Sequence, residues 1–173
     1  MKRLPSAGAV TLAAVAALAL ATPAAAQFEK LAGKPFDSAY VRDFYLEGNS
    51  IPTQKRNTVM LKDQAGKRLV FSLLDTTGYS AEIQAKYIGM LIFERPVTLG
   101  DARIPAGAYG FGLRKGQTPE SAATLLVYDV GGAKVGETAA AHDAAIERPV
   151  PLQVVTKDAA SRLYAGRHWV QVQ

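Results

Sequence analysis

The stretch that decides the fold covers residues 97–113 and has the sequence VTLGDARIPAGAYGFGL. Pro105 fixes φ for the second position of a turn and Gly107 suits the fourth, so we expect a turn there, with a second turn signal just before it at Gly100. Side chains of a strand alternate between its two faces. After the turn, one face therefore carries three large apolar side chains: Tyr109, Phe111 and Leu113.

The opposite face of this strand carries only Ala108, Gly110 and Gly112. Interior glycines weaken a strand, so a contact should offset their cost. We expect that a neighbouring aromatic side chain lies across them or that they permit a bulge. The functional alternative is a shallow groove where a ligand or partner strand approaches the backbone, which makes Gly110 and Gly112 candidate binding residues. A flat edge used for self-association is the third interpretation.

Short apolar stretches separated by turn signals recur along the rest of the chain, for example over residues 68–74, 87–93 and 122–130. Residues 38–46 are a further candidate strand, residues 79–86 a short helix capped by Ser80, and residues 139–146 a helical turn or a loop. Turn signals spaced about every 8–12 residues, without a long helix, are typical of a β-sandwich or small barrel. We therefore predict an all-β, antiparallel β-sandwich of about eight or nine short strands, forming a single domain over residues 27–173.

A local resemblance supports this fold. The hexapeptide Ile-Pro-Ala-Gly-Ala-Tyr at residues 104–109 resembles the L-P-A-G-x-Y turn-and-strand motif of secreted bacterial β-sandwich domains, several of which have unknown function. The resemblance covers one hairpin, implies an extracytoplasmic sandwich, and implies no activity.

The first 26 residues have the layout of a cleavable signal peptide. Lys2 and Arg3 precede an apolar run over residues 7–21, and small residues end at Ala26. Cleavage after Ala26 would place the mature chain in the periplasm or outside the cell. No later apolar run approaches the length that crosses a bilayer, so we expect no membrane span in the mature chain. The chain has no cysteine, so its stability must depend on the core without disulfides.

Charge argues against a nucleic-acid partner. The formal net charge is +5 at pH 7, and Lys2 and Arg3 contribute two of these charges. The other basic residues occur as scattered pairs near turns, whereas a nucleic-acid surface needs a clustered basic stripe.

Residues for the standard chemistries are missing or wrongly spaced. The sequence Asp75-Thr76-Thr77-Gly78 lacks the contiguous Asp-Thr-Gly of aspartic proteases and favours an Asp-initiated turn. The two histidines, His142 and His168, lack the usual metal-binding spacing, so a site that uses both is the minor alternative, and the glycines form no phosphate-binding loop. We therefore expect no cofactor, no metal and no catalytic residues, with His142 in an exposed loop and His168 packed locally on a strand.

Trp169 and Arg167 are the remaining candidate binding residues. Trp169 shares a strand face with the polar residues Arg167, Gln171 and Gln173, and an indole in that setting favours recognition, since tryptophan is enriched at interfaces. The structural alternative is a tryptophan that covers the edge of the sandwich. We predict a non-catalytic binding or interaction module whose partner is a protein, a glycan or a small molecule, with self-association through an edge strand as an option. The alternatives are a small-barrel carrier of an apolar ligand, favoured by the doubly apolar residues 87–93, and a hydrolase with a non-standard site.

Export gives the first testable prediction. Because residues 1–26 carry the signal pattern, the exported protein should begin at Gln27. Intact-mass spectrometry of the protein from the extracytoplasmic fraction checks this, and a mature chain that retains Met1 would contradict it.

Overall fold

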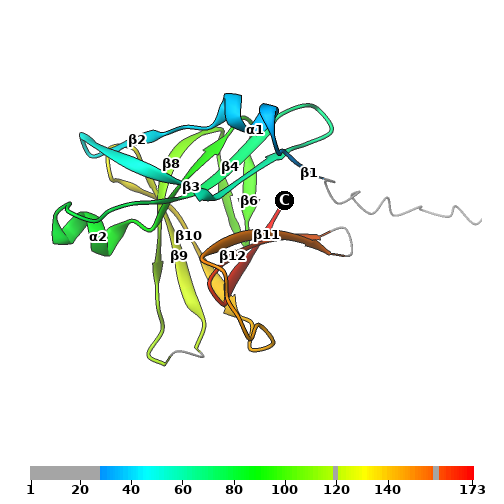
Figure 1. Ribbon diagram of the computed structural model, residues 1–173. Coiled ribbons are helices and arrows are strands. Elements are labelled where there is room, and N and C mark those ends of the chain that lie inside the picture. Colours follow the sequence, from blue (N-terminus) through cyan, green and yellow to red (C-terminus); the bar gives the residue numbers. More distant parts are fainter. Residues whose placement is uncertain (1–27, 119–120, 158–159) are drawn as a thin grey trace, which may run out of the picture.

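The computed structural model describes residues 28–118, 121–157 and 160–173 (Figure 1). The predicted signal peptide lies outside these described residues. Two helices of six residues each are present, α1 (Lys34–Ala39) and α2 (Ala81–Lys86). No helix in the described part of the chain is long and apolar enough to cross a membrane.

The fold is an antiparallel β-sheet that curls into a half-barrel (Figure 1). Its strands pair in the order β1-β3-β4-β5-β8-β9-β10-β13-β12-β11, β2 pairs with β3, and the hairpin β6–β7 pairs with β13 through β6. Because the sheet curls, β11 at one end of this order approaches β3 near the other end. The strands are β1 (Glu29–Lys30), β2 (Asp43–Leu46), β3 (Asn49–Lys62), β4 (Arg68–Leu74), β5 (Gly89–Phe93), β6 (Val97–Leu99), β7 (Ala102–Ile104), β8 (Gly107–Arg114), β9 (Ala123–Asp129), β10 (Lys134–His142), β11 (Leu152–Lys157), β12 (Ala160–Ala165) and β13 (His168–Val172).

The all-β, antiparallel prediction is confirmed, but the strand count of eight or nine is wrong, since the described residues form 13 strands. One curled sheet takes the place of the two separate sheets of a sandwich. The candidate strand at 38–46 divides into the end of α1 and β2, because Pro35 begins a helix at its first turn.

Residues 139–146 are the second local error. β10 extends to His142, because Ala139 and Ala140 pair with β9 while Ala141 and His142 pair with β13. Partners on both sides of the strand override the helical preference of an alanine run.

The prediction for residues 97–113 is confirmed. β6 and β7 form a tight hairpin around Gly100, whose φ of 56° lies in the left-handed region. β8 follows and pairs with β5 on one side and β9 on the other. This hairpin lies against β13 and brings Leu99 and Ile104 into the interior, where both are fully buried.

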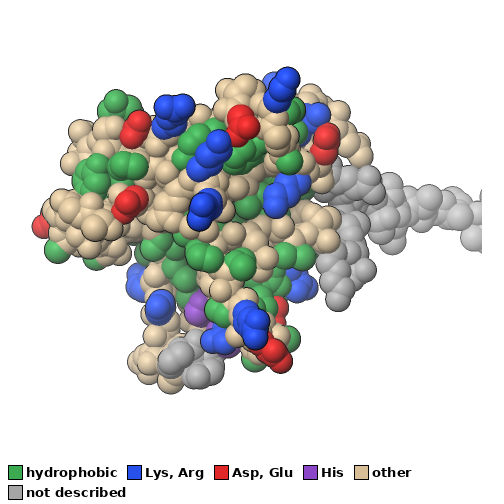
Figure 2. Space-filling model, viewed as in Figure 1, with side chains coloured by type: hydrophobic (Ala, Val, Ile, Leu, Met, Phe, Trp, Pro, Cys, Tyr) green, Lys and Arg blue, Asp and Glu red, His purple; other side chains and the backbone are tan. Residues whose placement is uncertain are grey.

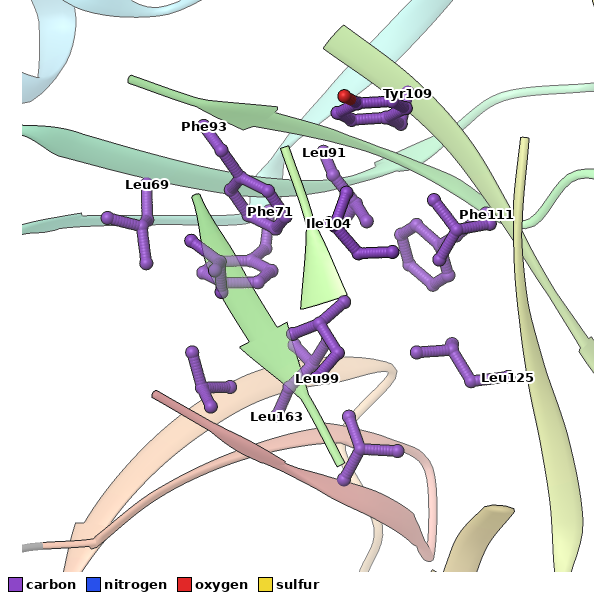
Figure 3. Close-up of a cluster of buried hydrophobic side chains, with 14 of the residues drawn as sticks. Leu69, Phe71, Leu91, Phe93, Leu99, Ile104, Tyr109, Phe111, Leu125 and Leu163 are labelled. Carbon is purple, nitrogen blue, oxygen red and sulfur yellow. The ribbon is translucent and has the colours of Figure 1, made fainter. Parts of the chain in front are cut away.

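The concave side of the sheet encloses the main core. Tyr109 and Phe111 point into it from β8, as the alternation predicted, and meet side chains from β4, β5, β6 and β9 (Figure 3). The members drawn and labelled there are Leu69, Phe71, Leu91, Phe93, Leu99, Ile104, Tyr109, Phe111, Leu125 and Leu163.

A second core covers the convex side of β3, β4, β5 and β8. Here α2 and the β2–β3 hairpin place Tyr87, Ile83 and Leu46 over the sheet. The ring of Tyr87 lies over Gly110, and the carbonyl oxygen of Lys86 lies over Gly112. An aromatic side chain therefore covers the bare face of the strand, which was the first of the interpretations for these glycines.

The contact between Tyr87 and Gly110 predicts a sensitive position. A Cβ at Gly110 would lie 2.5 Å from a ring carbon of Tyr87, far inside van der Waals contact. We expect Gly110→Ala to lower the free energy of unfolding in urea by about 1–3 kcal/mol, the usual cost of overpacking. Gly131→Ala is the matched control, because Gly131 is exposed with no steric conflict, and it should change the value by less than about 0.5 kcal/mol. Equal stability of the two variants would show that this contact is not tight.

Candidate functional site

An open cleft lies where the β8–β9 loop, the β10–β11 loop and the β12–β13 turn meet. Its volume is about 490 Å³, and its polar lining includes Lys115, Gln117, His142, Arg167 and His168. In Figure 2, histidine (purple) reaches the surface in the lower part of the view with Lys and Arg side chains (blue) beside it. Residues far apart in the sequence thus converge on one surface.

The two histidines lie side by side in this cleft. His142 on β10 is the direct cross-strand partner of His168 on β13, and their ring centroids are 5.3 Å apart. The expectation that His142 lies in an exposed loop is wrong, because it depended on ending β10 too early, whereas His168 lies on a strand as expected. Extending the strand to His142 would have placed this histidine correctly, but only the register of β10 with β13 brings it beside His168.

His168 has a defined protonation pattern. Its Nε2 lies 3.1 Å from the carbonyl oxygen of Ser121. A carbonyl oxygen only accepts hydrogen bonds, so Nε2 carries the proton and donates it. In the neutral ring, Nδ1 then keeps a lone pair that is available to a ligand.

Arg167 is held in position by the β10–β11 loop. Its Nε donates to the carbonyl oxygen of Ile146 at 2.9 Å, and its Nη2 donates to the carbonyl oxygen of Glu147 at 3.2 Å. The N–H groups of Nη1 take no part in these bonds. The side chain is exposed and oriented in advance, which lowers the entropy cost of binding a ligand. The sequence-based candidate Arg167 therefore lines the cleft.

The charged side chains that line the cleft are positive. Among its described lining residues there are two permanent cations, Lys115 and Arg167, and no carboxylate. The nearby Asp143 is engaged elsewhere, since it accepts hydrogen bonds from the Tyr164 hydroxyl and the backbone of Ala145. A concave surface with charge of one sign attracts counter-ions of the other.

Trp169 lies apart from Arg167. The guanidinium carbon of Arg162 stands 4.0 Å from the centroid of the Trp169 ring, which is the geometry of a cation–π contact, and Tyr164 packs beside the indole. Tyr164 and Trp169 are cross-strand partners, so both side chains lie on the same face of the β12–β13 pair. Trp169 is half-buried by these contacts and lies on the opposite face of β13 from His168.

Gly110 and Gly112 do not belong to the cleft. Both are buried, on the convex side of β8, beneath Tyr87 and the end of α2. The structure thus separates the four sequence-based candidates into three places, with only Arg167 in the cleft. His142, His168 and Lys115 are lining residues that sequence reasoning did not select.

A second polar cluster joins α2 to two turns. Lys86 forms an ion pair with Glu47 and donates to the Gly132 carbonyl at 2.7 Å, with its ammonium 4.8 Å from the centroid of Tyr128. The Tyr87 hydroxyl donates to the same Glu47 carboxylate at 2.6 Å. Each of these polar groups is matched by another within the protein, so the cluster acts as a structural clamp.

The clamp shifts two pKa values. The hydrogen bond from Lys86, with that from Tyr87, holds the pKa of the Glu47 carboxyl below its usual range. Burial, together with the hydrogen bond to Glu47, raises the pKa of the Tyr87 hydroxyl well above its usual value. At neutral pH the cluster therefore contains a charged pair and a neutral phenol.

No group of three or more histidine, cysteine or carboxylate side chains with metal-binding geometry occurs in the described part of the chain. Comparison with protein-family models, with curated proteins and with solved structures finds no match to this chain. Function therefore has to be inferred from the geometry of the site.

The clamp predicts an acid-sensitive contribution to stability. A carboxyl whose pKa is lowered by folding stabilises the protein above its unfolded-state pKa, and this contribution is lost as the pH falls through the folded-state pKa. We expect Glu47→Gln to lower the free energy of unfolding near pH 7 by about 1 kcal/mol, a value reduced by solvent screening of a partly exposed pair. The difference from wild type should shrink as the pH falls below the unfolded-state pKa, about 4.3, towards the lower folded-state pKa.

Urea unfolding at several pH values measures this difference. Glu137→Gln is the control for an exposed ion pair on β10, and its effect should be small at every pH. A Glu47→Gln effect that stays constant down to pH 3 would contradict the role of the charge.

Proposed function

We propose that the protein is an extracytoplasmic, non-catalytic binding module that holds a small anionic ligand in the cleft between the β8–β9 loop and the β12–β13 turn. The single observation that supports this most is the convergence of Arg167, Lys115 and the two histidines on one concave surface without a carboxylate in its described lining. The extracytoplasmic location rests on the signal pattern of residues 1–26.

The chemistry of the lining favours an anion. Guanidinium groups bind carboxylates and phosphates through parallel N–H donors, and Arg167 presents the N–H groups of Nη1 after its Nε and Nη2 are engaged. Lys115 adds a second charge and Gln117 an amide that can donate or accept. A volume of about 490 Å³ lies in the range of small-molecule sites.

One apolar space inside the curled sheet is too small for an apolar ligand. The apolar space between β8, β9, β12 and β13, bordered by Phe111, Leu125 and Leu163, measures about 10 Å³. That volume is about one water-sized probe, too small for a hydrocarbon ligand. This observation favours the cleft over the carrier alternative.

The hydrolase alternative lacks a connected set of groups. Nucleophilic catalysis needs a nucleophile hydrogen-bonded to a base that a third group orients. Within the described residues, the hydrogen bond of His168 goes to a backbone carbonyl, and no ion pair joins either histidine to a carboxylate. The lining therefore supports binding better than turnover.

The proposal predicts specific anion binding that depends on Arg167. Titration of the mature protein, treated with a chelator, with acetate, succinate and inorganic phosphate should shift the backbone NMR signals of residues 115–118 and 166–168. Neutral glycerol should leave these signals unchanged. Arg167→Gln should weaken the tightest of these anions by about tenfold or more, the loss expected for one charged hydrogen bond.

Arg103→Gln is the matched control, since Arg103 is exposed on β7 and does not line the cleft. It should leave the affinity unchanged. Shifts spread evenly over all lysines and arginines, or equal effects of the two variants, would overturn the proposal.

A further inference from the structure

We infer that His142 and His168 together bind one divalent late transition-metal ion, such as zinc, on the floor of the cleft. The pair is an independent feature of the fold, because it is built by the register of β10 with β13 and needs neither Arg167 nor Lys115. Neutral imidazole nitrogens are preferred ligands of zinc, nickel and copper.

The separation of the rings fits a shared metal. Two imidazoles that each bind one tetrahedral zinc at about 2.0–2.1 Å hold their ring centroids roughly 5 Å apart. The observed centroid distance is 5.3 Å, with the ring planes inclined by 64°. Direct cross-strand partners keep this spacing because the sheet fixes both backbones.

The tautomer of His168 also fits a metal ligand. Its Nε2 donates to the Ser121 carbonyl, which leaves the lone pair of Nδ1 for a metal. Metal-binding histidines in proteins generally donate their other ring N–H to a carbonyl or carboxylate, which fixes the ring and raises the basicity of the ligating nitrogen. Ser121 supplies that second contact from the loop that precedes β9. Both histidines are only partly buried, so an ion can enter from the cleft.

Two protein ligands leave open positions on the metal. Lys115 and Arg167 line the same cleft, and their positive charges repel a bare dication. A metal ion that has an anion bound to it is repelled less, because the anion attracts both side chains. We therefore expect metal and anion to strengthen each other's binding, and this part of the inference rests on the proposed function. Thermodynamic linkage requires the two enhancements to be equal.

The composition of the chain excludes competing zinc sites made from other histidine or cysteine side chains. It contains two histidines and no cysteine, so every nitrogen or sulfur side-chain ligand of the usual zinc set lies in this one pair. The protein must carry no histidine tag during the measurement. Isothermal titration calorimetry with zinc chloride, in a buffer without carboxylate or phosphate, should show one ion per chain.

His142→Gln and His168→Gln should each weaken zinc binding by about tenfold or more, since even outer contacts of metal ligands contribute that much. Glu137→Gln removes an exposed carboxylate from the same strand and should leave the affinity unchanged. Absence of a saturable zinc site in the wild type, or unchanged binding in the double histidine variant, would overturn the inference.

The wild-type protein gives a second readout that does not depend on the folding of a variant. In long-range ¹H–¹⁵N spectra, zinc should shift the Nδ1 signal of His168 while Nε2 stays protonated. A zinc response at Nε2 alone, or at neither histidine, would contradict the assignment.

Acetate then separates the two proposals. Acetate should tighten zinc binding in the wild type, and zinc should tighten acetate binding by the same factor. If zinc binds the histidines while acetate has no effect, the metal site stands and the coupling fails. If acetate binding to the chelator-treated protein is also insensitive to Arg167→Gln, the proposed anion site fails independently of the metal.

Discussion

The contact of Tyr87 with Gly110 allows β8 to be buried on both faces. A side chain at position 110 would hold Tyr87 away from the sheet. The packing of α2 and the β2–β3 hairpin against the convex side of the sheet would then be disrupted. With glycine there, the ring reaches the backbone, its hydroxyl meets Glu47, and Lys86 closes the cluster against the β9–β10 turn. Because Gly110 has no Cβ, β8 can pack against both hydrophobic cores, one on each side of the sheet.

Local signals predicted much of the fold. The helix capped by Ser80 and the double turn of residues 97–113 both appear, because each depends on residues close in sequence. The strand count and the extent of β10 were wrong, since both depend on partners far along the chain. The alanine-rich segment favours a helix by itself, but its pairing with strands on both sides decides its conformation.

The site was harder to predict than the fold. Arg167 could be selected as a polar residue near a turn, but nothing in the spacing of His142 and His168 indicates that they are neighbours. Their proximity follows from strand register, which a periodic pattern on one strand does not contain. The bare face of β8, by contrast, was visible in the sequence, and its two glycines are accounted for by packing against Tyr87 and Lys86.

The histidine pair occupies the junction between two parts of the sheet. β10 runs alongside β9 for most of its length but meets β13 only through Ala141 and His142. So short a ladder gives little hydrogen-bond protection, and brief local separation of β10 from β13 should need less free energy than separation of β10 from β9. Any ion or molecule that bridges the two strands would suppress that opening. Backbone amide hydrogens of β10 and β13 should then exchange more slowly when the cleft is occupied.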